Sequence, residues 1–283
     1  MPAHFALVFA AVGTGLAWWW NRRVRGFLPD DLPLPGRKQH GRPVPLAGIA
    51  LLPVLLCWQL LAEQWLLASA TAAVAALGFV DDWHKERTGD LDWRRKAVVL
   101  LGAAVAVAAT TFDPLARPGA FALVVALVFV LTNAANFLDN TDGVSAAVVG
   151  TGLLLATGGR GELGAAGFAA LGFLPWNWPR PALFLGDAGA YALGLCAGAA
   201  VTRALADTGP TPAGMAAAAL PFAVLLLDFT QVVIARLLLG LRPWVGDRRH
   251  LTHVLHNFGL PRVLVAPALA AAALAIWRWL PSR

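Results

Sequence analysis

Apolar runs recur from one end of the chain to the other, and short polar segments separate them. Runs of this kind are typical of membrane-spanning helices. The pattern predicts ten spans, at residues 3–20, 44–62, 65–80, 97–112, 120–137, 144–157, 163–176, 187–203, 213–239 and 262–280. Several are shorter than the roughly 20 residues that cross a bilayer, so tilt or burial must make up the difference. Because the ninth contains Pro221, we expect it to be bent or broken.

The composition supports this prediction. Of the 283 residues, 58% are hydrophobic and only 13% are charged, whereas a soluble domain carries roughly 25% charged residues. We therefore expect an all-α polytopic membrane protein, with one integral-membrane domain over residues 1–283. The net charge of +6 does not indicate a nucleic-acid partner, because Lys and Arg in membrane proteins usually report topology. Cys57 and Cys196 lie inside apolar runs and are interpreted as packing residues.

The basic residues are distributed unevenly over the predicted loops. With the N-terminus outside, the inner loops and inner span ends hold 17 of the 22 Lys and Arg residues. This asymmetry predicts an outside N-terminus. The acidic residues, histidines and glycine turns also gather on the inner side, so we expect an enzyme site on the cytoplasmic face.

A polar segment, Asn133 to Val144, stands between two apolar runs. Asn133, Asn136, Asp139 and Asp142 recur at intervals of three, and residues three apart share one face of a helix. Carboxylates and carboxamides at a membrane boundary are costly unless they bind something. A hard cation, with an anionic substrate held through it, fits such groups. The alternative is a polar turn between two spans.

Two further acidic motifs lie at predicted span ends. Asp81 and Asp82 end the third span, where adjacent carboxylates raise one another's pKa unless a cation is near; a solvated helix end is the alternative. Gly186-Asp187 opens the eighth span and places a carboxylate beside free backbone N–H groups, which suits a metal or a phosphate. Gly-Asp turns are also common without such a role.

Two basic segments complete the candidate chemistry. His250, His253 and His256 recur at intervals of three after Arg248, and predict a titratable face that contacts phosphates. No zinc motif of the His-Glu-x-x-His type is present, and the alternative is an interfacial amphipathic helix. Lys38 and His40 lie in a loop before the second span. The alternative is that their charge only fixes the orientation of the chain in the membrane.

Taken in order, these motifs resemble one family. The motifs are similar to those of the polyprenyl-phosphate N-acetylhexosamine-1-phosphate transferases. They are Asp-Asp, Asn-x-x-Asn-x-x-Asp-x-x-Asp-Gly, Phe-x-Gly-Asp-x-Gly and the histidine cluster. The resemblance runs from about Arg37 to Leu260. The family's architecture of ten spans with an outside N-terminus agrees with the prediction above.

The resemblance implies a reaction. A polyprenyl phosphate, such as undecaprenyl phosphate, attacks the β-phosphate of a UDP-N-acetylhexosamine and releases UMP, with Mg²⁺ required. We also consider Mn²⁺ as the ion and a homodimer as the assembly. The implied location is the bacterial cytoplasmic membrane, crossed several times.

The resemblance also implies roles for individual residues. Asp187 would ligate the metal. Asp81 or Asp82 would deprotonate or orient the lipid phosphate, and Asp139 and Asp142 would shape the nucleotide and metal region. The remaining expected contacts to substrate come from Asn136, from Asn177 and Phe184 around the uracil, from His250 and His253, and from Lys38, His40 and Arg248.

The sequence departs from the family pattern in a few places. Asn140 stands where Gly is usual, Val144 where Leu is frequent, Ala190 where Ser is usual, and Thr252 at the middle His of His-x-His-His. No carboxylate is lost, so we expect activity. The histidine spacing favours transfer of N-acetylglucosamine 1-phosphate over phospho-N-acetylmuramoyl-pentapeptide. Two hypotheses of a different kind stay open: a transporter of lipid-linked sugars, and an inactive relative with a scaffolding role.

Overall fold

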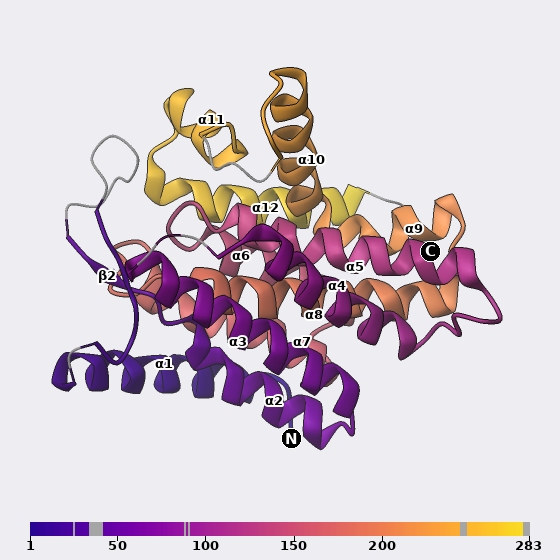
Figure 1. Cartoon of the computed structure of the whole chain (residues 1–283), viewed down its shortest axis with the longest axis horizontal. Coiled ribbons are helices and arrows are strands. Elements are labelled where there is room, and N and C mark those ends of the chain that lie inside the picture. Colours follow the sequence, from indigo (N-terminus) through magenta and orange to yellow (C-terminus); the bar gives the residue numbers. More distant parts are fainter. Residues whose placement is uncertain (25, 34–41, 88, 90, 244–247, 280–283) are drawn as a thin grey trace.

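The computed structural model describes residues 1–24, 26–33, 42–87, 89, 91–243 and 248–279. Helices dominate it (Figure 1). The α-helices are α1 (Phe5–Arg23), α2 (Leu52–Leu61), α3 (Trp65–Arg87), α4 (Trp93–Ala109), α5 (Pro118–Leu138), α6 (Val144–Thr157), α7 (Gly161–Asn177), α8 (Gly186–Thr208), α9 (Pro212–Ala219), α10 (Ala223–Leu238), α11 (Leu251–Asn257) and α12 (Arg262–Trp279). Two 3₁₀ segments, η1 (Gly48–Leu51) and η2 (Leu220–Phe222), precede α2 and α10.

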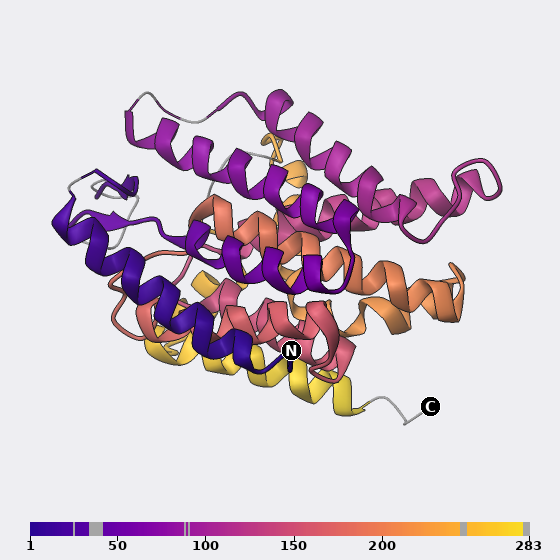
Figure 2. The same ribbon diagram turned by 90° about the horizontal axis from the view of Figure 1, so that it is seen from below.

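Every predicted apolar run contains a helix, although the second run, 44–62, begins with the strand β2 (Val44–Pro45) and with η1 before α2 starts at Leu52. Five helices are long and apolar enough to cross a membrane by length and composition, counting Pro212–Leu238 as one. The predicted break in the ninth run is confirmed, because α9, η2 and α10 divide it at Pro221. Figure 1 shows α10 rising at a steep angle from the other helices, which run side by side when seen from below (Figure 2). The ten-span topology itself stays a prediction.

The all-α prediction needs one small correction. Asp30–Asp31 (β1) and Val44–Pro45 (β2) form a two-residue antiparallel pair. The chain after β2 continues this extended pairing along the loop before α8, where the Phe184 N–H donates to the Pro45 carbonyl over 2.9 Å and the Ala47 N–H donates to the Phe184 carbonyl over 2.9 Å. Backbone groups that no helix satisfies are thereby paired. The segment that follows the basic loop is fixed against the start of α8.

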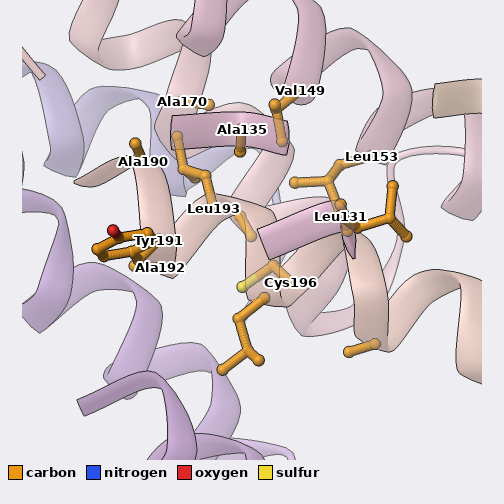
Figure 3. Packing of buried hydrophobic residues seen from close by; sticks show 14 of the residues in the cluster. Leu131, Ala135, Val149, Leu153, Ala170, Ala190, Tyr191, Ala192, Leu193 and Cys196 are labelled. Carbon is orange, nitrogen blue, oxygen red and sulfur yellow. The ribbon is translucent and has the colours of Figure 1, made fainter. Parts of the chain in front are cut away.

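Helix α8 forms the centre of the bundle, and most of its residues are buried. It packs against α5, and small side chains let the two helices approach closely. A Cβ on Gly194 would lie 2.8 Å from the Thr132 Cα of α5. Cys196 is buried in the same contact region, beside Leu131 and Leu193 (Figure 3), and it forms no disulfide. This agrees with its interpretation as a packing residue.

A second close approach sets the position of the α8 N-terminus against α3. A Cβ on Gly78 would lie 2.4 Å from the Asp187 carbonyl carbon and 2.4 Å from the Ala188 backbone nitrogen. These are backbone atoms, which cannot rotate away as a side chain can. The lack of a side chain at Gly78 therefore allows the residues around Asp187 to rest directly on α3.

Gly78→Ala is expected to lower both stability and activity. Overpacking costs about 1–3 kcal/mol, and the forced shift falls on Asp187. Gly102→Ala is the matched control, because a Cβ there meets no atom within 4 Å. Alanine also has a higher helix propensity than glycine, so this substitution should not destabilise α4. Thermal unfolding in detergent checks the pair. Equal thermal midpoints for the two variants would contradict the close-packing account.

Candidate active site

A cavity of about 1660 Å³ opens where the ends of α3, α5, α8 and α10 meet. Most of the residues predicted from the sequence line it: Asp82, Asn136, Asp139, Asp142, Asn177, Phe184, Asp187, Arg248, His250 and His253. Asp81 lies directly behind this lining, fully buried. Lys38 and His40 lie outside the described residues. The structure thus brings together residues that are more than 160 positions apart in the chain.

The pair Asp81 and Asp82 lies inside a helix, contrary to the expectation that it ends one. Helix α3 continues to Arg87, because the basic residues of its last turn, Lys85 and Arg87, complement the helix dipole. The two carboxylates consequently point to different partners. Asp82 accepts the backbone N–H groups of Asp187, over 3.2 Å, and Ala188, over 3.4 Å. It stabilises the first turn of α8, as a capping side chain does.

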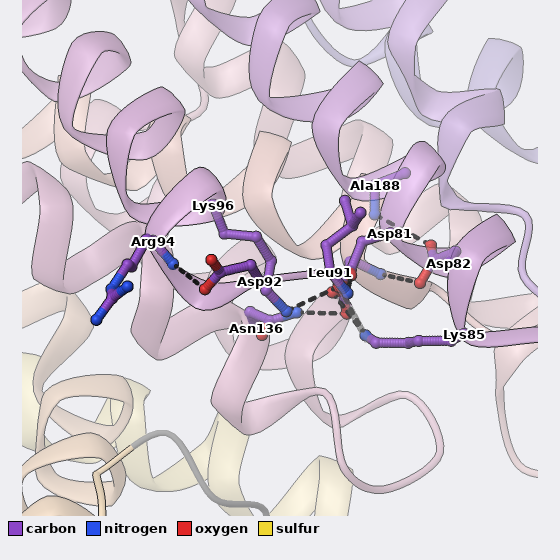
Figure 4. A network of polar contacts seen from close by, with 10 residues as sticks. Asp81, Asp82, Lys85, Leu91, Asp92, Arg94, Lys96, Asn136 and Ala188 are labelled. Carbon is purple, nitrogen blue, oxygen red and sulfur yellow. Dashed lines mark hydrogen bonds and ion pairs between the residues drawn. The ribbon is translucent and has the colours of Figure 1, made fainter. Parts of the chain in front are cut away.

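Asp81 and Asp187 share a lysine that the sequence motifs did not single out. The Lys85 Nζ lies 2.7 Å from Asp187 Oδ2 and 3.1 Å from Asp81 Oδ2 (Figure 4). Lys96, from α4, lies 2.9 Å from the same Asp81 oxygen, and the Leu91 N–H donates to the other over 2.9 Å. The spacing of four from Asp81 to Lys85 is a sequence signal for such a contact.

Asp187 is almost fully buried, and both its oxygens have partners. Lys85 takes one oxygen, and Asn136 Nδ2 donates to the other over 2.7 Å. Asn136 comes from α5, so the contact links the polar segment of α5 to the start of α8. The sequence motifs did not predict this contact between Asn136 and Asp187.

The polar segment after residue 132 is only partly helical. Helix α5 ends at Leu138, and Asp139 follows it with a ψ of 49°, so Asp139 and Asp142 lie on a turn rather than on the predicted helical face. Turn-forming residues, Asn140-Thr-Asp-Gly143, explain the ending. Asn177 Oδ1 accepts the Gly143 N–H over 2.9 Å, and its Nδ2 donates to the Leu183 carbonyl over 3.0 Å. The Asn177 amide thus holds this turn beside the loop before α8.

Asp139 lies in an electrostatically unfavourable place for a carboxylate. Burial, and then the negative charge of Asp187, raise its pKa to about 8, while a hydrogen bond from the Gly186 N–H opposes the shift. A nearby cation would favour its ionised form. Without one, the raised pKa favours its protonated form.

Two of the three spaced histidines reach the cavity. His250 occupies the N-cap position of α11 without a capping hydrogen bond from its side chain, and His253 lies in the first turn. Both line the cavity. Burial, followed by the nearby His250 and Arg248, lowers the pKa of His253, which favours the neutral form of its ring. His256 lies 3.1 Å from the Leu260 carbonyl oxygen through its Nδ1.

Two of the departures from the family pattern meet in space. The Thr252 hydroxyl donates to Asn140 Oδ1 over 2.5 Å, and Thr252 is buried. The contact joins α11 to the turn that carries Asp139 and Asp142. Ala190 is also buried, within α8, and does not line the cavity.

The acidic floor of the cavity fits a divalent cation. Asp82, Asp139 and Asp187 line the cavity together with Lys85 and Lys96, so carboxylate oxygens and ammonium groups lie close together there. Within the described ranges, no three His, Cys, Asp or Glu side chains form a metal-binding group. Mg²⁺ usually takes one or two carboxylates together with substrate phosphates, so Asp187 with a bound phosphate suits it.

Comparison with known proteins agrees with this arrangement. Residues 64–204 match the family model Glycosyl transferase family 4. A protein of Streptomyces coelicolor, named only by the general class of glycosyltransferase, is 32% identical over 84% of this chain and 60% of its own length. The undecaprenyl-phosphate α-N-acetylglucosaminyl 1-phosphate transferase of Thermotoga maritima is 29% identical over 77% of this chain and 70% of its own length.

A relative from the phospho-N-acetylmuramoyl-pentapeptide branch of the family is equally similar. The phospho-N-acetylmuramoyl-pentapeptide-transferase of a Synechococcus species is 30% identical over 72% of this chain and 66% of its own length. The chain thus spans 60 to 70% of the length of these relatives. The identities do not separate the two branches, but both belong to the family that the motifs resemble. The chain belongs to glycosyl transferase family 4, among the polyprenyl-phosphate N-acetylhexosamine-1-phosphate transferases.

Proposed function

We propose that the chain transfers a phospho-N-acetylhexosamine from a UDP-sugar to a polyprenyl phosphate and releases UMP. The observation that carries this proposal is one cavity with an acidic floor around Asp187 and basic side chains around it, among them Arg42, Arg180, Arg248 and Arg262. Such a site suits a diphosphate bound through a cation, because phosphoryl transfer depends mainly on positioning and charge neutralisation.

In this proposal the bond changes are simple. An oxygen of the lipid phosphate forms a bond to the β-phosphorus, and the bond from that phosphorus to the bridging oxygen breaks, so UMP leaves. The lipid phosphate is already ionised at pH 7 and needs no strong base. Asp81, held between Lys85, Lys96 and the Leu91 N–H, therefore acts in organising the lysines rather than in removing a proton.

The other residues follow from their places in the cavity. Lys85 and Lys96 neutralise phosphate charge, and His250, His253 and Arg248 contact the diphosphate or the sugar. Asp139 and Asp142 shape the nucleotide side, with Phe184 near the uracil. Asp187 would hold Mg²⁺, which supplies neutralisation of charge on the diphosphate. Mn²⁺ is the alternative ion.

The proposal includes a setting. The chain is a single membrane domain with ten spans, an outside N-terminus and its cavity on the cytoplasmic face of a bacterial membrane. The distribution of basic residues supports this orientation. The assembly as a homodimer is part of the same proposal.

UMP release tests this function. Purified protein with Mg²⁺ and undecaprenyl phosphate is expected to release UMP from UDP-N-acetylglucosamine, at a higher rate than from UDP-N-acetylmuramoyl-pentapeptide. The histidine spacing supports that order. The reverse order would assign the chain to the muramoyl-pentapeptide branch. Movement of a lipid-linked sugar without UMP release from any donor would favour a transporter.

A further inference from the structure

Asp228 is a fully buried carboxylate of α10 with no role in the mechanism above. Its Oδ2 lies 2.8 Å from His250 Nδ1, and its Oδ1 accepts the Leu251 N–H over 2.7 Å. Leu251 is the first residue of α11. One carboxylate therefore fixes both the histidine ring and the backbone on which it stands.

Helix α10 contacts the same segment at two further points. Gln231 Nε2 donates to the Arg249 carbonyl over 2.8 Å, and the Arg236 guanidinium donates to the Pro243 carbonyl over 2.5 Å. These two contacts hold the segment by its backbone. The contact from Asp228 differs from them, because it reaches a side chain that lines the cavity.

The contact determines which nitrogen of His250 carries a proton. An ionised carboxylate only accepts hydrogen bonds, so Nδ1 must be the protonated nitrogen. Nε2 then accepts a hydrogen bond from a ligand when the ring is neutral and donates one when the ring is charged. Within the described residues, Nε2 has no hydrogen-bond partner.

The ring is also held from the side. Phe137 of α5 meets the His250 ring edge to face, with 6.2 Å between ring centroids, and the Arg236 guanidinium lies over the Phe137 ring, 5.1 Å from its centroid. With Nδ1 bound and the ring packed against Phe137, the imidazole has one orientation. His250 is itself one of the residues that line the cavity.

We infer that Asp228 is a positioning residue of the transferase: it holds the Nδ1–H of His250 and stabilises the charged ring, whose Nε2–H then donates to the anionic diphosphate of the UDP-sugar. This inference rests on the proposed function for the identity of the ligand. Carboxylates that orient metal-ligating histidines contribute roughly 10–100-fold to activity, and we expect a loss of the same order for a histidine that contacts a diphosphate. A histidine held in this way loses no orientational freedom when the substrate binds.

Kinetics of Asp228→Asn test the role. The variant keeps the shape, but an amide can accept or donate, so it no longer enforces one form of the ring. We expect kcat to fall about 10–100-fold, with KM for the UDP-sugar nearly unchanged. Gln231→Met is the matched control, because it removes another anchor of the same segment without touching His250. An equal loss of kcat in Gln231→Met would overturn the positioning role.

A double variant asks whether Asp228 acts through His250. If it does, Asp228→Asn combined with His250→Gln is expected to be no slower than His250→Gln alone, since residues that act as one unit are not additive. Multiplied losses in the double variant would contradict the inference. Equal thermal midpoints of the variants exclude a folding defect as the cause.

Nitrogen NMR of ¹⁵N-histidine-labelled protein gives a readout that does not need activity. The resonances that disappear in His250→Gln identify the ring. We expect the Nδ1–H form in the wild type and a mixture of forms in Asp228→Asn. A wild-type ring whose Nδ1 carries no proton would overturn the inference. This measurement decides the positioning claim even in a preparation that releases no UMP, so failure of the proposed function is distinguishable from failure of this inference.

Discussion

Replacing Asp187 with Asn is expected to lower UMP release by at least about 10³-fold, comparable with the loss of a principal electrostatic group in other enzymes. The side chain keeps its size, and its remaining oxygen can still accept from Asn136 or Lys85. What disappears is the negative charge that would hold Mg²⁺ beside the diphosphate. The rate with saturating UDP-N-acetylglucosamine, measured over a series of Mg²⁺ concentrations, checks this.

The control for Asp187→Asn is Asp113→Asn. Asp113 lies between α4 and α5, at the opposite end of the bundle, and accepts the Leu115 N–H over 2.8 Å. Its substitution removes one negative charge from the protein without approaching the cavity, so the rate should stay unchanged. Full activity of Asp187→Asn at ordinary Mg²⁺ concentration would show that the metal assignment is wrong.

Replacing Lys85 with Met should have the second-largest effect. The change leaves Asp187 and Asp81 without the ammonium group they share. Loss of one partner of a fully buried ion pair costs roughly 3–5 kcal/mol. Because the Lys85 side chain is 34% exposed to the cavity, we expect a smaller cost of about 1–3 kcal/mol. Turnover should fall about 10²-fold with the loss of phosphate neutralisation.

Mg²⁺ distinguishes this account of Lys85 from simple destabilisation. In Lys85→Met a divalent cation can replace the missing positive charge, so Mg²⁺ should raise the thermal midpoint more than it does in the wild type. Arg95→Gln removes an exposed positive charge of α4 and should show the wild-type response. If Mg²⁺ stabilised Lys85→Met and the wild type equally, the ammonium group would not be competing for the cation position.

The helices could be predicted from the sequence because the evidence for them is local. Each apolar run corresponds to a helix, and Pro221 marks the break between α9 and α10. Most of the site residues that the motifs indicated also line the cavity. The resemblance to the family supplied the order of the motifs along the chain. The carboxylates could be singled out because burying a charged group near a membrane is costly unless it has a function.

The contacts that could not be predicted are those between residues far apart in the sequence, because they depend on how the helices pack. Asp82 lies against the start of α8, more than 100 residues away in the chain, so its capping role depends on how α3 and α8 pack. Lys96 reaches Asp81 from another helix. Asn140 and Thr252 looked like two separate departures from the family pattern, but they form one contact across 112 positions.

Transfer of the β-phosphate itself is the most direct test of the proposed activity. UDP-N-acetylglucosamine labelled with ³²P in the β-position, incubated with the protein, Mg²⁺ and undecaprenyl phosphate, should place the label in the lipid extract. One unlabelled UMP should appear for each labelled lipid. Label that remained water-soluble while UMP was released would indicate hydrolysis. That result, or no release of UMP from any UDP-N-acetylhexosamine donor, would contradict the assignment as a phospho-sugar transferase.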